Sequence, residues 1–564
     1  MFFTRMAHLA SSFACNRQLP SLGASGIATA VLLIQLSAVS TPAAAAQTTH
    51  AHGDIGVVNF NVSCAPAVRE DFDRAVGMLH HMMYGEARQA FERIARQDPQ
   101  CAMAHWGIAM TLFQPLWPAR PSEKDRQRGW DAVQHAKRLG IATPRERALV
   151  AAAEAFFREP QKDEWWPRIH RWADSMKDAY QQHPQDTETA AFYALSELAV
   201  GQAATDQAAH NARAAEVLAA VYAKEPRHPG GSHYTIHAND IAGRAGESPA
   251  IVRGYNEIAP DVPHALHMPS HIYVRLGEWP EVIEWNRRSA EAALNFPAGD
   301  RMSLHHAHAL AYQLYAHLQR GEDHKARAVL DQLRAQEQPY QEDFASAFHL
   351  AAMPARYAVE RRAWEEAAAL EPRTPRYLAW DRYWWPEALT WFVRGLGAAH
   401  TGDLPRAREA ERRMAELRQQ ADAAGEKTFA TYIESDRLIL SGRIAQAEGE
   451  RGTALARMRE AAELEGTVEK NPITPGALLP AHEAMGDLLL EQHRPEEALE
   501  AYKQSLAVWP NRYRSLLGAA RAAAAANQRR EAEGHYKQLL AITEGADTDR
   551  PGVREARDYA FRAR

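Results

Sequence analysis

At 564 residues the chain is too long for one compact core, so we expect either several domains or growth by repetition. Its 65 Lys and Arg balance 71 Asp and Glu with no block of like charge, which argues against nucleic acid or an anionic membrane as partner. The hydrophobic fraction of 46% and the 14 Trp argue against a disordered chain, because this composition can bury enough apolar area to fold.

Residues 1–46 have the pattern of an export signal. Two arginines stand in a polar lead, residues 27–36 are mostly apolar, and three alanines end at Ala46. We predict cleavage near Ala46 and a periplasmic or secreted protein. The alternative is a membrane anchor, but the apolar run is about half of the ~20 residues that a spanning helix needs. The long lead leaves Met6 as an alternative start. No later stretch is apolar enough for stable membrane insertion.

Two cysteines, Cys64 and Cys101, remain once the signal is removed. We predict a helix over 67–83 that turns at Gly85 into a second helix over 86–97, which places both cysteines at the open end of one helical hairpin. An even pair in an oxidising compartment favours a disulfide between them. The alternative is two unpaired, buried thiols.

Histidines are concentrated in the centre of the chain, where ten of the 26 fall within 90 residues. Two pairs recur with a displacement of 34 residues, His233 with His267 and His237 with His271. Within each predicted helix the two histidines, His233 with His237 and His267 with His271, are four residues apart and so share one face. Asp240 continues the face of the first helix three residues further on. Equivalent positions on successive repeats could therefore meet.

A further helix is predicted over 303–320, in which His305 and His308 share a face with two tyrosines. Pro269 is compatible with a helix that begins near Leu266, because proline is tolerated in the first turn. If that helix began only at Met268, the preceding histidine would leave the shared face.

Histidines four apart on one helix are a usual way to hold a metal ion, and Asp240 could be a ligand or could orient a ring. Ligands of this kind suit a divalent transition metal such as zinc, copper, nickel or iron without distinguishing them. The candidate ligands are His233, His237, Asp240, His267, His271, His305 and His308. The alternative is a hydrogen-bond network between repeats that binds no metal.

Weaker candidates lie elsewhere. Residues 80–83, His-His-Met-Met, contain ligands that suit copper, although methionine at helical spacing more often packs in a core. Tryptophan is concentrated at 165–166 and 380–391, where an aromatic groove or ordinary core packing could result. The sequence has no phosphate-binding loop, nucleophile elbow, Cys-x-x-Cys or His-Glu-x-x-His motif, so hydrolase and nucleotide-binding functions have no support.

The clearest repeat lies near the C-terminus, where Ala498 and Tyr502 recur 34 residues later as Ala532 and Tyr536. Gly486 stands on the preceding helix, where a small residue lets two helix backbones approach while tyrosine fills the space between them. Noisier versions of this pattern occur at 68–110 and 229–292, and strand signals are scarce.

This pattern resembles the tetratricopeptide repeat family, and the His-rich block resembles a group of uncharacterised secreted bacterial members. The resemblance implies an all-α solenoid of helical hairpins wound into a right-handed superhelix, whose concave groove binds a protein or peptide. In that register His264, Tyr312 and Tyr315 line the groove beside the candidate ligands. The predicted segments are a signal at 1–46, an extended segment at 47–66, N-terminal repeats at 67–228, His-rich repeats at 229–340, degenerate repeats at 341–470, a C-terminal repeat pair at 471–545 and a tail at 546–564.

Two functions fit these features, and the sequence favours the first. The first is an exported scaffold that binds a protein or peptide partner, which is what the family commonly does. The second is a metalloprotein, whose ion could act as a Lewis acid or redox centre in an enzyme. The metal content of the purified protein separates them.

Overall fold

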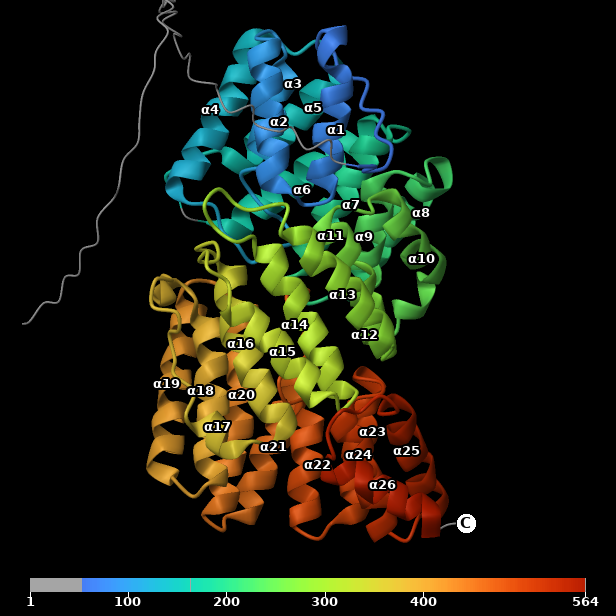
Figure 1. Ribbon diagram of the computed structural model, residues 1–564. Helices are drawn as coiled ribbons and strands as arrows, with labels where there is room; N and C mark the ends of the chain where they lie inside the picture. The colour runs from blue at the N-terminus through green and yellow to red at the C-terminus, as the bar shows by residue number, and fades with distance from the viewer. Residues whose placement is uncertain (1–52, 163, 563–564) are drawn as a thin grey trace, which may run out of the picture. The chain divides into compact units, whose positions relative to one another are not determined.

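The computed structural model describes residues 53–162 and 164–562, and within these ranges the chain is all-α. The only β pairing in them is two isolated bridges beside the loop at residues 294–303. Each long helix packs against the next one along the chain, so that the fold is a stack of helical hairpins, as the repeat pattern predicts (Figure 1). The predicted export signal lies outside the described residues.

The N-terminal helices bury several large aromatic side chains, among them Phe72, Trp106 and Trp172. Their bounds are α1 (Arg69–His80), α2 (Tyr84–Gln97), α3 (Ala102–Met110), α4 (Glu123–Leu139), α5 (Pro144–Phe157), α6 (Trp165–Gln182), α7 (Thr187–Gly201) and α8 (Gln207–Lys224). The predicted turn at Gly85 is wrong by a few residues. The chain reverses at Met82, which has a left-handed φ of 58°, and Gly85 already belongs to α2. The pattern had pointed to glycine because it adopts this conformation most easily.

The central helices carry all the candidate histidines, and Asp240 is the residue that follows the end of α9. They are α9 (Pro229–Asn239), α10 (Pro249–Ile258), α11 (Pro263–His267), α12 (Pro269–Leu276), α13 (Trp279–Ala293), α14 (Leu304–Gln319) and α15 (Asp323–Arg334). Gly243 and Gly277 have left-handed φ of 79° and 69°, and Gly277 is the C-cap residue at which α12 ends. Helix α14 matches the predicted helix over 303–320 to within one residue at each end.

The remaining helices continue the stack to the C-terminus. They are α16 (Phe344–Arg361), α17 (Trp364–Ala368), α18 (Trp384–His400), α19 (Leu404–Ala423), α20 (Lys427–Ala447), α21 (Arg451–Glu465), α22 (Ala481–Glu491), α23 (Pro495–Val508), α24 (Tyr513–Ala525), α25 (Arg529–Ile542) and α26 (Pro551–Arg562). No helix among the described residues combines the length and the apolar character needed to span a bilayer. The tryptophans at 380 and 385 are buried core residues.

Tyr502 shows how the repeat pattern fixes helix packing. Its ring is fully buried, and a Cβ atom added to Gly486 would lie 2.8 Å from it. A Cβ atom on Gly518 of the following helix would lie 2.2 Å from the same ring. The tyrosine therefore fills a space that exists only because both neighbouring helices carry glycine where they approach it, as predicted for Gly486.

The extended segment before the first helix is part of the folded core. Ile55, Phe60 and Val62 are buried, and the Val57 N–H donates to the Arg227 carbonyl at 2.9 Å. Cys64, at the end of this segment, forms a disulfide with Cys101. The disulfide therefore joins the entry to α1 to the start of α3, across one helical hairpin.

Candidate metal centre

Helix α9, the nearly continuous pair α11 and α12, and helix α14 bring the candidate histidines together. Helix α9 begins at Pro229, whose fixed φ suits the first helical turn, and the buried N-cap residue His228 accepts the Gly231 N–H through Nδ1. Helices α11 and α12 follow each other almost without interruption, because Met268 between them keeps helical dihedral angles. His264, His267 and His271 therefore share one face despite Pro269.

All the predicted site residues are buried, so they lie between helices and not on an open groove. Exposed fractions range from 0% for His233 and Tyr312 to 8% for His237 and His305. The helices pack with these faces toward one another, so the positions expected to line a concave surface are covered. The full set below 9% exposure is His233, His237, Asp240, His264, His267, His271, His305, His308, Tyr312 and Tyr315.

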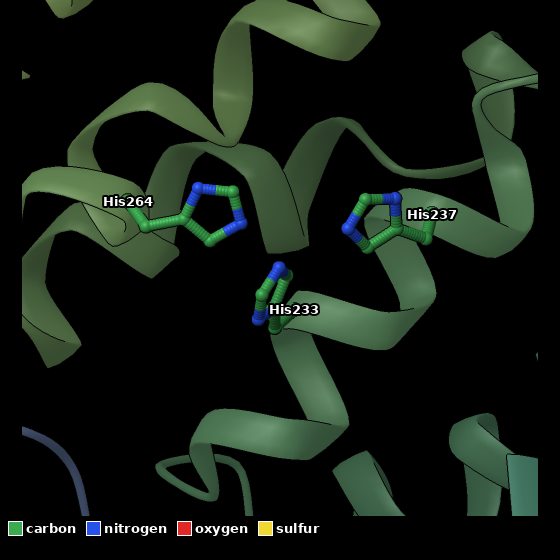
Figure 2. Close-up of side chains that lie close together, drawn as sticks. All are labelled: His233, His237 and His264. Atoms are coloured by element: carbon green, nitrogen blue, oxygen red, sulfur yellow. The ribbon is translucent and has the colours of Figure 1, made fainter. Parts of the chain in front are cut away.

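Triad A consists of His233, His237 and His264. Each ring directs a nitrogen toward a common point between α9 and α11 (Figure 2). One ligand nitrogen from each residue can be chosen so that all lie within 4.8 Å of one another. Both nitrogens of His237, both of His264 and Nε2 of His233 are buried without a hydrogen-bond partner. Five partnerless nitrogens in one place are costly unless a further species binds them.

The hydrogen bond of one His233 ring nitrogen determines the protonation state of the other. Nδ1 lies 2.6 Å from the carbonyl oxygen of His80, which can only accept a hydrogen bond, so Nδ1 carries the proton. Nε2 is left with a lone pair that points into the triad. This arrangement, in which the outer nitrogen donates to an oxygen and the inner one is free, is usual for histidines that bind metals.

Triad B consists of His267, His271 and His308, which also offer nitrogens within 4.8 Å of one another. His271 donates from Nδ1 to the Asp240 carboxylate at 2.8 Å. His267 donates from Nδ1 to Asn286 Oδ1 at 2.7 Å, and the amide orientation is set because Asn286 Nδ2 donates to the Val282 carbonyl. Both rings therefore present unprotonated Nε2 atoms.

These two Nε2 atoms lie 2.9 Å apart. Two lone pairs at this distance repel each other unless a proton or a cation lies between or beside them. Burial lowers the pKa of His267 well below its usual value, and burial also lowers that of His271 despite the hydrogen bond to Asp240, so a proton is disfavoured. Two nitrogens bound to one ion at about 2.05 Å would stand about 2.9 Å apart at the roughly 90° angle of square-planar or octahedral coordination, and about 3.3 Å apart at the tetrahedral angle.

Asp240 acts on the ring and not at the ligand position. Its carboxylate accepts from His271 Nδ1, from Arg275 Nε at 3.0 Å and from Lys470 Nζ at 2.7 Å. Nearby Lys470, His271 and Arg275 outweigh burial and hold the pKa of Asp240 well below its usual value. The carboxylate is thus ionised and committed to orienting His271, which is one of the two predicted roles.

Of the remaining predicted residues, His305 and Tyr312 border the triads and Tyr315 does not. The His305 ring lies 5.1 Å from that of His264, and Tyr312 packs edge-on against His267 at 4.5 Å. The Tyr312 hydroxyl donates toward the carbonyls of Pro472 and Thr474. Tyr315 instead contacts Arg512 through its hydroxyl, so it is not part of the histidine cluster.

Sequence reasoning missed two members of this cluster. His349 on α16 lies 3.0 Å, through Nε2, from Nδ1 of His308. Trp117 covers the cluster from the α3–α4 connection, with its ring 5.4 Å from His264 and 5.3 Å from His308. Neither residue stands in the 34-residue register, so no sequence signal marked them.

A small cavity adjoins both triads. It is lined by Met82, Leu116, Trp117, Pro118, His237, His264, His271, His308, Pro472 and Ile473. Its volume, counted as space for the centre of a water-sized sphere, is about 10 Å³. This is about enough for one water molecule or one ion.

A second buried histidine group shows what a satisfied network looks like. His80 and His228 each bond to one oxygen of Glu188, at 2.8 and 3.0 Å. Their other nitrogens face Tyr234 Oη and the Gly231 N–H. Every ring nitrogen has a partner there, although one ligand atom from each of the three side chains can also be chosen so that all lie within 4.8 Å of one another. The proximity of three histidine or carboxylate side chains is therefore not enough to identify a metal site. Triads A and B differ from this network because triad A has ring nitrogens without a partner, and in triad B two unprotonated nitrogens face each other.

No family model matches the chain, and no curated protein matches it in sequence. Among solved structures the chain is similar to the APC/C hetero-tetramer Cut9–Hcn1, with 14% identity over 88% of this chain and 89% of that chain and a TM-score of 0.32.

Proposed function

We propose that this chain is a metalloprotein that holds transition-metal ions in its buried histidine cluster, one at triad A and one at triad B. The observation that carries the proposal is the pair of unprotonated Nε2 atoms of His267 and His271, 2.9 Å apart with both Nδ1 atoms already donating to oxygens. A bound cation turns this repulsion into coordination. The partnerless nitrogens of triad A support a second ion.

The protonation state of the cluster suits metal binding. Burial lowers the pKa of His237 to about 3, and burial with neighbouring imidazoles lowers that of His233, His264 and His308 well below the usual value. The rings are therefore neutral near pH 7, and neutral imidazole is the form that binds metals. Histidine-only ligands suit zinc, copper and iron.

Metal analysis of the purified protein tests the proposal. The protein is stripped with a chelator, reloaded separately with Zn²⁺, Cu²⁺ and Fe²⁺, desalted and assayed by elemental analysis. We expect two ions per chain for the preferred metal, with one lost in His308→Gln and the other lost in His237→Gln. The matched control is His306→Gln, a buried histidine two residues away on α14 whose Nδ1 faces the Tyr340 hydroxyl.

Less than one ion per chain with all three metals would contradict the proposal. Equal metal content in His308→Gln and His306→Gln would also contradict it, because the two variants lose the same ring from the same helix. Circular dichroism of each variant separates a lost site from a lost fold.

Export to the periplasm or the exterior is part of the proposal. The Cys64–Cys101 disulfide supports it, because disulfides persist mainly in oxidising compartments. N-terminal sequencing of the protein recovered from each cell fraction tests it, with a mature terminus near residue 47 expected. A protein or peptide partner, which the repeat pattern also predicts, is supported by the helical-hairpin fold alone, since such stacks commonly present extended binding surfaces.

A further inference from the structure

The segment at residues 470–474 lies between the histidine cluster and a second cavity. Pro472 and Ile473 face the cluster, while Lys470, Asn471 and Thr474 line this cavity. The other walls come from α16, α18, α20, α21 and the end of α23. Its volume, counted in the same way as for the smaller cavity, is about 270 Å³, so it can hold a small organic molecule.

Four aromatic side chains line the cavity. The ring of Trp385 packs against those of Phe348 and Tyr432, each with centroids 4.7 Å apart, and Trp509 contributes another face. Exposed residues at the margin include Gly466, Gln504 and Val508. Aromatic faces carry a negative quadrupole, so they attract cations as well as apolar groups.

Two carboxylates face this cavity without a cation. Asp436 lies on α20, and Glu465 is the last residue of α21, where the helix dipole adds negative potential. Within residues 53–162 and 164–562, neither side chain forms an ion pair, and Glu465 accepts one hydrogen bond, from the Ala481 N–H at 3.1 Å. Burial and the proximity of Glu465 raise the pKa of Asp436, and burial raises that of Glu465 to about 7.

The lysine and arginine side chains that line the same cavity are committed elsewhere, and burial lowers the pKa of the remaining basic residue, His482, so that its ring is neutral. Lys470 and Arg275 both donate to Asp240, and Arg275 also pairs with Glu469 at 3.0 Å. Arg356 donates to the backbone carbonyls of Gly476 and Ala477. Lys470 and Arg275 therefore have carboxylate partners. Arg356 and Arg512 act on Asp436 and Glu465 only through space, and among the described residues neither of these carboxylates forms an ion pair.

We propose that this cavity binds a small organic cation, an amine with an apolar or aromatic body, whose ammonium group lies between Asp436 and Glu465. The aromatic walls take the body of the ligand and contribute cation–π attraction. An anion would meet two carboxylates, and a bare metal ion would leave most of the aromatic space unfilled. The cavity is a different site from triads A and B, so this proposal stands or falls independently of metal binding.

Isothermal titration calorimetry at pH 8 tests the proposal, because both carboxylates are then more fully ionised. The probes are phenethylamine, its neutral isostere 2-phenylethanol and the anion 3-phenylpropionate. Benzyltrimethylammonium is added because a quaternary ammonium ion cannot coordinate a metal, so its binding cannot come from the histidine cluster. We expect both cations to bind at least 10-fold more tightly than the alcohol and the anion not to bind.

Variants locate the binding. Asp436→Asn and Glu465→Gln should each weaken binding of both cations at least 10-fold. The matched control is Glu463→Gln, an exposed carboxylate on the same helix as Glu465, which should leave the affinity unchanged. If Asp436→Asn does not fold, Glu465→Gln alone decides the point.

Three results would overturn the proposal. The first is equal affinity for phenethylamine and 2-phenylethanol, which would mean that charge is not recognised. The second is unchanged cation affinity in Glu465→Gln. The third is displacement of benzyltrimethylammonium by millimolar Ca²⁺ or Mg²⁺, which would make the carboxylates an inorganic-ion site.

Discussion

Lys470 stands 230 residues after Asp240 in the chain, yet its ammonium group donates to the Asp240 carboxylate at 2.7 Å. Both side chains are 1% exposed. The lysine belongs to the connection between α21 and α22, so this ion pair fastens a distant loop onto the residue that orients His271. The pair therefore couples the geometry of triad B to the packing of the C-terminal half of the chain.

Replacing Asp240 should harm both stability and metal binding. Asp240→Asn leaves Lys470 and Arg275 buried without a full counter-charge, so we expect a loss of about 3 kcal/mol or more in the free energy of unfolding. Metal affinity should fall about 10- to 100-fold, because His271 loses its carboxylate partner. Urea unfolding and competition with a metal-binding dye measure these effects.

Asp331→Asn is the control for this change, because Asp331 is exposed and pairs only with arginines of its own helix. It should change stability by less than about 1 kcal/mol. If Asp240→Asn behaved like Asp331→Asn in both assays, Asp240 would not be the residue that organises triad B.

His81 gives a prediction about pH. It is fully buried between the Tyr255 hydroxyl and the Ile55 carbonyl, and burial lowers its pKa to about 4. Between about pH 6.5 and pH 4 the unfolded chain binds a proton at this residue and the folded chain does not. The contribution of His81 to the free energy of unfolding is therefore fully present above about pH 6.5. It is lost as the pH falls toward pH 4, at about 1.4 kcal/mol per pH unit.

His81→Gln should reduce the slope of unfolding free energy against pH by about that amount between pH 6 and pH 4.5. The measurement is a set of urea titrations at closely spaced pH values. His324→Gln, an exposed substitution, serves as control and should leave the slope as it is. A wild-type slope retained in His81→Gln would show that this histidine does not titrate in the folding transition.

The disulfide should contribute substantially to stability. Cys64 and Cys101 are 37 residues apart, and closing a loop of this length stabilises the folded state by about 4 kcal/mol in the chain-entropy description. Reduction with dithiothreitol should therefore lower the melting temperature of the wild-type protein. The double variant Cys64→Ser, Cys101→Ser should already melt at the lower temperature and should not respond to the reductant. A wild-type melting curve insensitive to reduction would refute this.

Gly518 should not tolerate a side chain. A Cβ atom there would lie 2.2 Å from the Tyr502 ring, so Gly518→Ala should cost about 1–3 kcal/mol through overpacking. Gly534→Ala on α25 is the matched control, because no atom lies within 4 Å of its Cβ position and alanine favours a helix by up to about 1 kcal/mol. Thermal unfolding should move in opposite directions for the two variants, and a shift in the same direction would refute the packing role of Gly518.

The repeat pattern predicted the helical hairpins well because it reports local packing. Gly486 and Tyr502 approach each other as expected, and α14 has nearly the predicted bounds. The turn before α2 was misplaced because Met82 adopts a left-handed φ, which the sequence does not predict for a methionine. A non-glycine residue in such a turn is fixed by its surroundings and not by its own preference.

The histidine pattern pointed to the part of the chain where the rings gather, but not to the way they group or to what surrounds them. The histidines four residues apart, His233 with His237 and His267 with His271, share a triad. Those 34 residues apart fall in different triads. His349, Trp117 and Lys470 reach the cluster from helices and loops outside that register, so their positions depend on tertiary packing alone. Burial was likewise hidden, since a repeat pattern does not show which stripe of a helix the neighbouring repeats cover.

The extended segment at residues 53–65 sets a boundary for shortening this protein. It supplies the carbonyl acceptor for His81, buries Ile55 and Phe60 and carries one half of the disulfide. A truncation that started at the first helix would remove the buried side chains that cover the N-terminal hairpin. It would also leave the buried His81 ring without the Ile55 carbonyl as its acceptor. Shortened versions intended for crystallisation or binding assays should therefore retain the chain from Gly53 onward.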